Sequence, residues 1–318
     1  MTWVGSYWIG ALFYGLLFLL VIDILKLSDF FLGWFPNWAL LDIVQTKRIF
    51  LVSISVIIVL ALTGGTIRAR FPIVTETTIT MNNFNQDLEE YNIAVISDLH
   101  LGTLVGESYL RKIIGMINDI DADAVMIIGD LVDEPPEKIG WAIEPLQEIE
   151  SKDGVYFVSG NHEAYAGISK TLELIQQANI TMLDDSLAQV GNAINLAGVG
   201  DRAGNSQSGF PFKPIKDILR SVDKALPVIL MNHTPMRKSE AEKAGVDLMV
   251  CGHTHGGQIW PFGVFTKMIF KSAQGLSTFG KMNLFISNGI GTWGPPVRIC
   301  APPEIWHLTI KPKEDNGA

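Results

Sequence analysis

Cysteine and basic residues are both scarce in this chain. Its 318 residues include only Cys251 and Cys300. Two cysteines do not form a disulfide framework, so we predict both as buried small hydrophobic residues and infer nothing about redox compartment. Lys and Arg number 24 against 33 Asp and Glu, and residues 71–318 carry nineteen of the former against thirty of the latter. An acidic domain without a basic stripe argues against nucleic acid as a partner.

Charge is missing altogether from two long segments near the N-terminus. Residues 1–22 contain no charged side chain, and a second uncharged run extends over residues 49–67. Each run is long enough to cross a bilayer. A cleaved signal peptide fits the first run poorly, because no Lys or Arg precedes it and no small-residue cleavage site follows it. We therefore predict a membrane anchor over residues 1–70, with transmembrane helices at about 6–26 and 49–67.

The segment between these helices is aromatic and contains Pro36, which predicts an interfacial loop or a short surface helix over residues 29–38. Basic residues give a weak indication of orientation. Two flank each end of the second helix, whereas the first helix has none before it and Lys26 after it. This imbalance favours a cytoplasmic connecting loop and a large domain on the outer face of the cell membrane.

From residue 71 onward, short apolar runs alternate with helical patterns and polar turns. Within residues 73–81, threonines alternate with other side chains, which predicts an edge strand. Buried strands are predicted at residues 91–97, 124–128, 154–159, 181–183, 194–200, 228–231 and 248–251. Helices are predicted at residues 108–121, 138–150, 169–179 and 215–225. This order predicts an α/β domain over residues 71–318, with ligands at the carboxyl ends of its strands.

Five of the predicted strands are followed by metal-ligand residue types. Five of the six histidines in the chain come after apolar strands, although a single histidine there is more often a packed core or turn residue. In an extended chain, residues i and i+2 point the same way, so we expect Asp98 and His100 to converge on one ion. Mixed carboxylate, imidazole and amide ligands suit Mn²⁺, Fe or Zn²⁺ better than Mg²⁺ or Ca²⁺. The full candidate set is Asp98, His100, Asp130, Asn161, His233, His253 and His255.

Taken in order, these strand ends resemble the five sequence blocks of the calcineurin-like metallophosphoesterases. The matching blocks are Asp98-x-His100, Gly129-Asp130-x-x-Asp133, Gly160-Asn161-His162-Glu163, His233 and Gly252-His253-Thr254-His255. Each block is weak alone, but all five in order are specific, and the resemblance covers roughly residues 91–310. It implies a four-layer α/β/β/α metallophosphoesterase sandwich following the transmembrane helical hairpin.

The resemblance also implies a role for each site residue. One divalent ion would be held by Asp98, His100, Asp130 and His255, and a second by Asp130, Asn161, His233 and His253. Asp130 would bridge the two ions, and a metal-bound hydroxide would attack phosphorus. His162 would protonate the leaving group, and Asp133 would accept its other N–H. We expect Glu163 and Thr254 to have packing or supporting roles, and Arg298 to be a solvated strand residue in preference to a substrate contact.

An apolar segment at residues 260–270 directly follows the last block. We expect it to be an ordinary β segment that covers the sheet. The alternative is an apolar lip beside the metals that faces the bilayer, with Lys267 and Lys271 suited to an anionic head group.

The sequence thus predicts a membrane-anchored, dinuclear-metal phosphohydrolase of phosphate esters or pyrophosphates, with lipid-linked substrates among the candidates. One alternative is a tethered phosphodiesterase or nuclease for soluble substrates, although the acidic balance opposes a nuclease. The other is a non-catalytic metal-binding regulatory module. That module predicts the loss of a metal ligand or of His162, and the sequence retains all of them.

Overall fold

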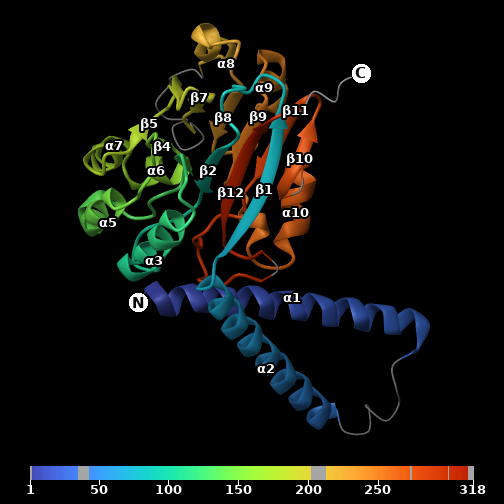
Figure 1. The fold of residues 1–318 in the computed structure, drawn as a ribbon. Coiled ribbons are helices and arrows are strands. Elements are labelled where there is room, and N and C mark those ends of the chain that lie inside the picture. The colour runs from blue at the N-terminus through green and yellow to red at the C-terminus, as the bar shows by residue number, and fades with distance from the viewer. Residues whose placement is uncertain (1, 35–42, 202–212, 273, 300, 314–318) are drawn as a thin grey trace.

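Two six-stranded sheets form the centre of the large domain (Figure 1). The structure is a computed structural model and describes residues 2–34, 43–201, 213–272, 274–299 and 301–313. The first sheet has the order β1-β12-β2-β3-β4-β5 and the second the order β10-β11-β9-β8-β7-β6. One apolar core contains residues of both sheets, including Val95 and Met126 from the first and Ile229 and Val250 from the second. The sheets therefore pack face to face.

Parallel strands occupy the middle of each sheet. In the first sheet β2, β3, β4 and β5 are parallel, while β12 is antiparallel to β2 and parallel to the edge strand β1. Its bounds are β1 Ile73–Met81, β2 Tyr91–Ile96, β3 Ala124–Ile128, β4 Val155–Val158, β5 Thr181–Met182 and β12 Glu304–Pro312. In the second sheet β7, β8, β9 and β11 are parallel, and β6 and β10 pair antiparallel at the edges. Its bounds are β6 Ser186–Val190, β7 Ile194–Val199, β8 Val228–Asn232, β9 Leu248–Cys251, β10 Gly275–Phe279 and β11 Met282–Ile286.

Helices cover the outer face of each sheet. The first sheet packs against α3 (Glu107–Asn118), α5 (Ile143–Gln147) and α7 (Ile168–Gln177), whose apolar residues form one core with Ala94, Val125 and Phe157. The second sheet packs against α8 (Ile215–Ile218) and α9 (Lys238–Ala244). The predicted four-layer α/β/β/α sandwich is therefore confirmed, as is the edge position of β1.

Several predicted elements differ in detail. The helix expected at 138–150 is broken into α4 (Pro136–Ile139), a 3₁₀ turn and α5, because Gly140 and Pro145 interrupt it. The helix expected at 215–225 ends at Ser221, where Asn195 binds both backbone groups of Asp223 and turns the chain. Strand β6 and the short helices α6 (Asn161–Ala166) and α9 were not predicted; α9 is largely polar and too short to show an apolar period.

The segment at 260–270 is a helix, so the expectation of a β segment is wrong. Helix α10 spans Phe262–Phe270, and none of its residues is buried. Its large apolar residues recur at helical spacing, from Phe262 to Phe265 and Ile269. β10, which follows this segment in the chain, is the edge strand of the second sheet.

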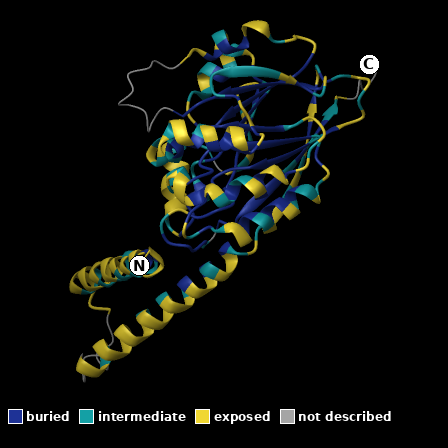
Figure 2. Ribbon diagram, turned by 90° about the vertical axis from the view of Figure 1, so that its left-hand side faces the viewer, coloured by how far each residue is buried: buried dark blue, intermediate teal, exposed yellow. Residues whose placement is uncertain are grey.

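Most residues of the two N-terminal helices are exposed (Figure 2), and many of them are large and apolar. Helix α1 spans Thr2–Leu32 and α2 spans Ile43–Ala69, and both enclose the predicted transmembrane segments. By length and composition, each can cross a membrane. Helix α1 includes residues 29–32 of the predicted interfacial segment, while residues 35–38 lie outside the described residues. Figure 1 shows both helices leaving the base of the domain and diverging.

A small apolar cluster joins these helices to the domain. Tyr14 of α1 and Leu62 of α2 pack with Ile259 and Val297 from two loops of the domain. Gly65 of α2 comes close to the second loop: a Cβ at this position would lie 3.1 Å from the Val297 Cβ. The Gly65 carbonyl accepts the backbone N–H of Arg298 at 2.9 Å. A side chain at this position would crowd the loop, so the close approach favours glycine.

Candidate metal centre

The candidate ligands meet at the carboxyl ends of the parallel strands of both sheets. Asp98 and His100 follow β2, Asp130 follows β3, Asn161 follows β4, His233 follows β8, and His253 and His255 follow β9. All but His253 are buried, and His253 is half-buried. The structure therefore brings all seven predicted ligands into one region.

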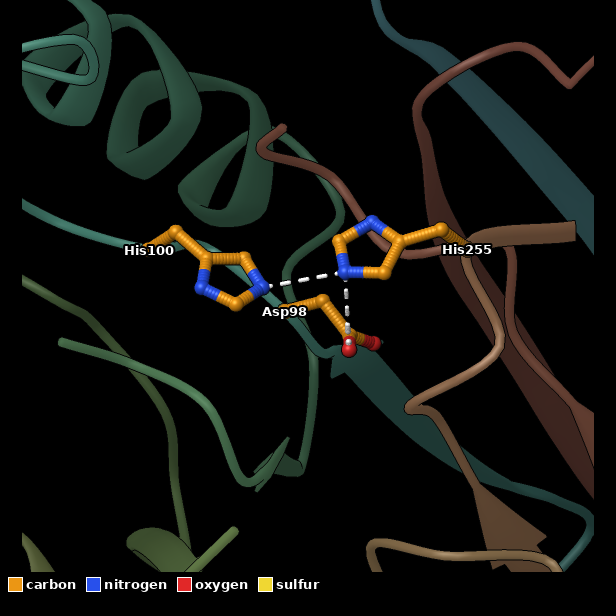
Figure 3. A group of neighbouring side chains, drawn as sticks. All are labelled: Asp98, His100 and His255. Carbon is orange, nitrogen blue, oxygen red and sulfur yellow. Dashed lines mark hydrogen bonds and ion pairs between the residues drawn. The ribbon is translucent and has the colours of Figure 1, made fainter. Parts of the chain in front are cut away.

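One group contains Asp98, His100 and His255 (Figure 3). The His100 Nε2 and His255 Nε2 atoms are 3.0 Å apart, and His255 Nε2 lies 3.4 Å from the Asp98 Oδ1. Burial, then the neighbouring His100, lowers the pKa of His255 well below its usual range. Two imidazole nitrogens and a carboxylate oxygen thus converge with His255 in its neutral form, which is the form that binds metals.

A second group contains Asp130, His233 and His253. The Asp130 Oδ2 lies 3.0 Å from His233 Nε2, and His233 Nε2 lies 3.3 Å from His253 Nδ1. The same Asp130 oxygen is 3.9 Å from His100 Nε2 in the first group. Asp130 is therefore within reach of both groups.

Asn161 provides an independent test of whether a metal ion fits. Its Oδ1 atom is buried and has no hydrogen-bond partner among the described residues. Such an atom costs free energy unless a ligand satisfies it. An amide oxygen beside carboxylate and imidazole donors suits a divalent ion, so the residues present fit a metal centre.

The backbone of the ligand loops is strained. Asp98, His100, Asp130, His253 and His255 all have positive φ angles, between 50° and 67°. This region is uncommon for residues other than glycine, and each such residue costs on the order of 1 kcal/mol or more. Asp98 and His100 thus lie beyond the strand, which ends at Ile96, and the expected extended i, i+2 geometry is wrong. The left-handed turns, and not an extended chain, bring their side chains together.

Glu163 supports these loops more directly than expected. It is fully buried, and its carboxylate accepts backbone N–H groups from Gly160 (2.6 Å), Asp130 (3.0 Å) and Leu131 (2.7 Å). Burial and the charge of Asp130 raise its pKa above the usual range. Gly160 allows the close approach, since a Cβ there would lie 2.2 Å from Asp130 Oδ1. Glu163 therefore fixes the turn that presents Asp130.

His162 and Asp133 lie beside the first group. His162 Nδ1 is 2.5 Å from Asp133 Oδ1, and the same oxygen is 3.3 Å from His100 Nδ1. Burial opposes protonation of His162, but the hydrogen bond to Asp133 and the charge of Asp130 outweigh it and raise the pKa of His162. Burial likewise raises the pKa of Asp133, and its hydrogen bonds with His100 and His162 lower it further than burial raises it. A charged Asp133 thus orients both imidazoles.

Two exposed aromatic residues beside His162 were missed by the sequence interpretation. The ring of Tyr165 lies 5.3 Å from that of His162 and the ring of Trp293 lies 6.5 Å from it. Their side chains are 67% and 59% exposed. No spacing rule links Trp293 to His162, because the two lie in segments far apart in the sequence. Both rings are available to contact a bound substrate.

Arg298 is not the solvated surface residue that was expected. Its side chain is completely buried and donates hydrogen bonds to the carbonyl oxygens of Gly291 (2.6 Å) and Asn288 (2.8 Å). Its Nη2 also lies 3.2 Å from the His255 Nδ1. Since a guanidinium only donates, this contact requires Nδ1 as the acceptor, which places the proton of a neutral ring on Nε2, whereas an ion at Nε2 requires the other tautomer. Burial lowers the pKa of Arg298 to about 10. Arg298 therefore contacts the ring of a predicted metal ligand, and loop carbonyls compensate for its burial.

Of the two cysteines, Cys251 is buried as predicted, whereas Cys300 lies outside the described residues.

Comparison with known proteins agrees with this geometry. The model of the family described as calcineurin-like phosphoesterase matches residues 91–257. An uncharacterized metallophosphoesterase of Helicobacter pylori strain J99 is 35% identical over 244 residues, which is 76% of this chain and 65% of that protein. One from Campylobacter jejuni is 33% identical, covering 83% of this chain and 69% of that protein. A zebrafish transmembrane protein with metallophosphoesterase domain is 30% identical, covering 80% and 60%.

Fold and donor set define a metal-dependent phosphoesterase scaffold. The chain belongs to the calcineurin-like phosphoesterase family. It spans just under two thirds of the length of the Helicobacter relative and 60% of the zebrafish relative.

Proposed function

We propose that this protein is a dinuclear-metal phosphohydrolase, anchored in the cell membrane, that cleaves phosphate esters or pyrophosphates. The observation that carries the proposal is the position of Asp130. One of its carboxylate oxygens lies 3.0 Å from His233 in one donor group and 3.9 Å from His100 in the other. A shared carboxylate between two buried donor groups is the arrangement expected for a bridged pair of ions.

The assignment of ligands follows the two groups. Asp98, His100 and His255 would hold one ion, and Asn161, His233 and His253 the other, with Asp130 common to both. Mixed oxygen and nitrogen donors favour Mn²⁺, Fe or Zn²⁺. Bound divalent ions would polarise the phosphoryl oxygens and lower the pKa of a coordinated water to provide the nucleophile.

Protonation of the leaving group is proposed to depend on His162 and Asp133. His162 is held by Asp133 at Nδ1, which leaves its Nε2 to donate a proton to the leaving oxygen. The raised pKa of His162 favours the protonated ring that this role requires. Its backbone N–H donates to Asp130 Oδ1 at 2.9 Å, so the acid is positioned relative to the proposed bridging ligand. Tyr165 and Trp293 border the leaving-group side of the site.

The N-terminal helices support membrane attachment, and relatives described as transmembrane proteins agree with it. The single Lys26 after the first apolar run favours the outer face of the membrane for the catalytic domain. A phosphate-containing substrate at the membrane, lipid-linked or soluble, is consistent with both features.

Metal counting and turnover together test this proposal. The full-length protein, reloaded with Mn²⁺, should bind two equivalents by elemental analysis and hydrolyse a soluble p-nitrophenyl phosphoester. Asp130→Ala should lose at least one equivalent and at least about a hundredfold in turnover, since bridging ions supply several kcal/mol of transition-state stabilisation. Asp87→Ala, at an exposed carboxylate away from the site, is the matched control. Two bound equivalents with full turnover in Asp130→Ala would contradict the bridging role.

A further inference from the structure

Helix α10 exposes an apolar surface that the metal centre does not explain. None of its nine residues is buried, and Met268 and Ile269 are 69% and 70% exposed. Val264 and Phe265 are each more than half exposed, as is Trp260 just before the helix. A contiguous apolar surface of this kind on a folded domain marks a contact with a membrane, a ligand or another protein.

The contacts at the two ends of α10 indicate what its apolar surface binds. At its start, the Phe262 ring stacks on Phe13 of the apolar helix α1, with centroids 5.0 Å apart. At its end, the Phe270 ring meets the edge of His253, a proposed metal ligand, at 6.1 Å. Nine helical residues extend about 13 Å. The helix therefore connects the surface of a candidate transmembrane helix with the metal centre, and Figure 1 shows the lower part of α10 close to α1.

A cavity of about 320 Å³ lies beside this helix. Its wall includes Thr254 and Gly256, the two residues on either side of His255 in the sequence. The rest is mainly apolar, with Ile259, Trp260, Val264, Ile286 and Ile299 among the lining residues. The space next to α10 thus reaches the loop that carries two proposed ligands, and its lining suits hydrocarbon.

Cationic groups occur at the end of the helix nearer the metal centre. Lys267 lines the cavity, and Lys271 ends the helix; both are exposed. Lys238 donates to the Phe270 carbonyl oxygen at 2.5 Å and to the Ser272 hydroxyl at 2.9 Å, which fixes the end of α10. Lysines beside an apolar surface attract anionic lipid head groups.

We propose that α10 and this cavity form an apolar track for the hydrocarbon chains of a phosphate-bearing membrane lipid, which delivers its phosphate to the metal centre. The track continues the apolar surface of α1, so a lipid can move along it without exposing its chains to water. This inference rests on the proposed function and narrows its substrate class to lipids.

Photocrosslinking tests the track without requiring turnover. The full-length protein is placed in nanodiscs that contain phosphatidic acid with a diazirine in one acyl chain. After irradiation, mass spectrometry should find lipid adducts on residues 259–270 as well as on α1 and α2. Added unlabelled phosphatidic acid should reduce the adducts on α10, and a soluble phosphomonoester should not. Adducts confined to α1 and α2 would overturn the proposal.

A paired activity measurement tests what the track does. The double variant Met268→Glu/Ile269→Glu places carboxylates on the exposed apolar face. Hydrolysis of nanodisc-embedded phosphatidic acid should fall about tenfold more than hydrolysis of a soluble p-nitrophenyl phosphoester, since charge opposes entry of hydrocarbon. Met182→Glu, at a 40% exposed position of edge strand β5, is the control and should change neither rate. Equal losses on both substrates, or no loss on either, would contradict the track.

The two measurements separate this inference from the proposed function. If the wild-type protein hydrolyses neither substrate, the proposed function fails, and the crosslinks still decide whether lipid occupies α10. If it hydrolyses only the soluble ester and α10 gains no adducts, the function stands and the lipid track is wrong.

Discussion

The N-terminal helices and the central sheets have similar apolar residues but opposite burial. In α1 and α2, Leu16 and Leu60 are 58% and 65% exposed, whereas Ile93 and Ile127 in the first sheet are 0% and 1% exposed. Figure 2 shows this contrast between the two regions. The strands that carry the candidate ligands have four to six residues and are followed by polar side chains, whereas the helices contain uncharged runs of about twenty residues. The length of an uncharged run therefore separates residues that a core buries from residues that a membrane would cover.

The largest expected effect is a loss of turnover when His162, beside the candidate metal ligands, is replaced. His162→Ala should keep its bound metal but lose about a thousandfold in turnover, most for esters with poor leaving groups, because the proton donor is gone. Elemental analysis and turnover with a series of substituted phenyl phosphoesters check this. His307→Ala is the control, since His307 lies on β12 and binds Asn92 away from the site. Equal turnover of His162→Ala and wild type would remove His162 as general acid.

The contrast in burial can be measured as stability. Phe157→Ala, at a completely buried position of β4, should lower the free energy of unfolding by about 3–5 kcal/mol, because it leaves a cavity between the sheet and its helices. Val59→Ala, at a 61% exposed position of α2, should change it by less than about 0.5 kcal/mol. Urea unfolding of the detergent-solubilised protein, followed by fluorescence, compares them. Similar losses in both variants would contradict the contrast.

Membrane insertion provides the complementary measurement. Leu16 and Leu20 are exposed on α1, and each replacement by Asp costs about 3 kcal/mol near the centre of a transmembrane helix. The double variant Leu16→Asp/Leu20→Asp should therefore become extractable by alkaline carbonate, while wild type stays in the membrane fraction. A double variant that resists extraction as wild type does would show that α1 is not embedded.

The smallest expected effect concerns the support of the ligand loops. Glu163→Gln replaces one of the two carboxyl oxygens that accept backbone N–H groups around Asp130 with an amide nitrogen, which cannot accept, so metal affinity should fall about tenfold. Chelator competition measures this affinity. Glu107→Gln is the control, because Glu107 is exposed and its ion pair is with Arg111, away from the ligand loops. An unchanged affinity in Glu163→Gln would limit Glu163 to packing.

Much of the fold, and the gathering of the candidate ligands at the strand ends, could be predicted, because both depend on short-range patterns. A buried parallel strand is a continuous apolar run, and the polar residue that follows it must lie at the sheet edge. The prediction was wrong where a distant partner decides the outcome. Arg298 is buried among the carbonyl groups of Asn288 and Gly291, and the segment from Phe262 to Phe270 is a helix that packs on Phe13 of α1.

The hydrogen bond between Gly65 and Arg298 has a mechanical consequence. The backbone N–H of Arg298 donates a hydrogen bond to the Gly65 carbonyl of α2. The guanidinium of the same residue contacts the ring of His255. A helix adjusts its tilt when the thickness of the surrounding bilayer changes. In a membrane-embedded protein, such a tilt would move the residue that contacts His255. Bilayer thickness would then reach the proposed metal site through Arg298.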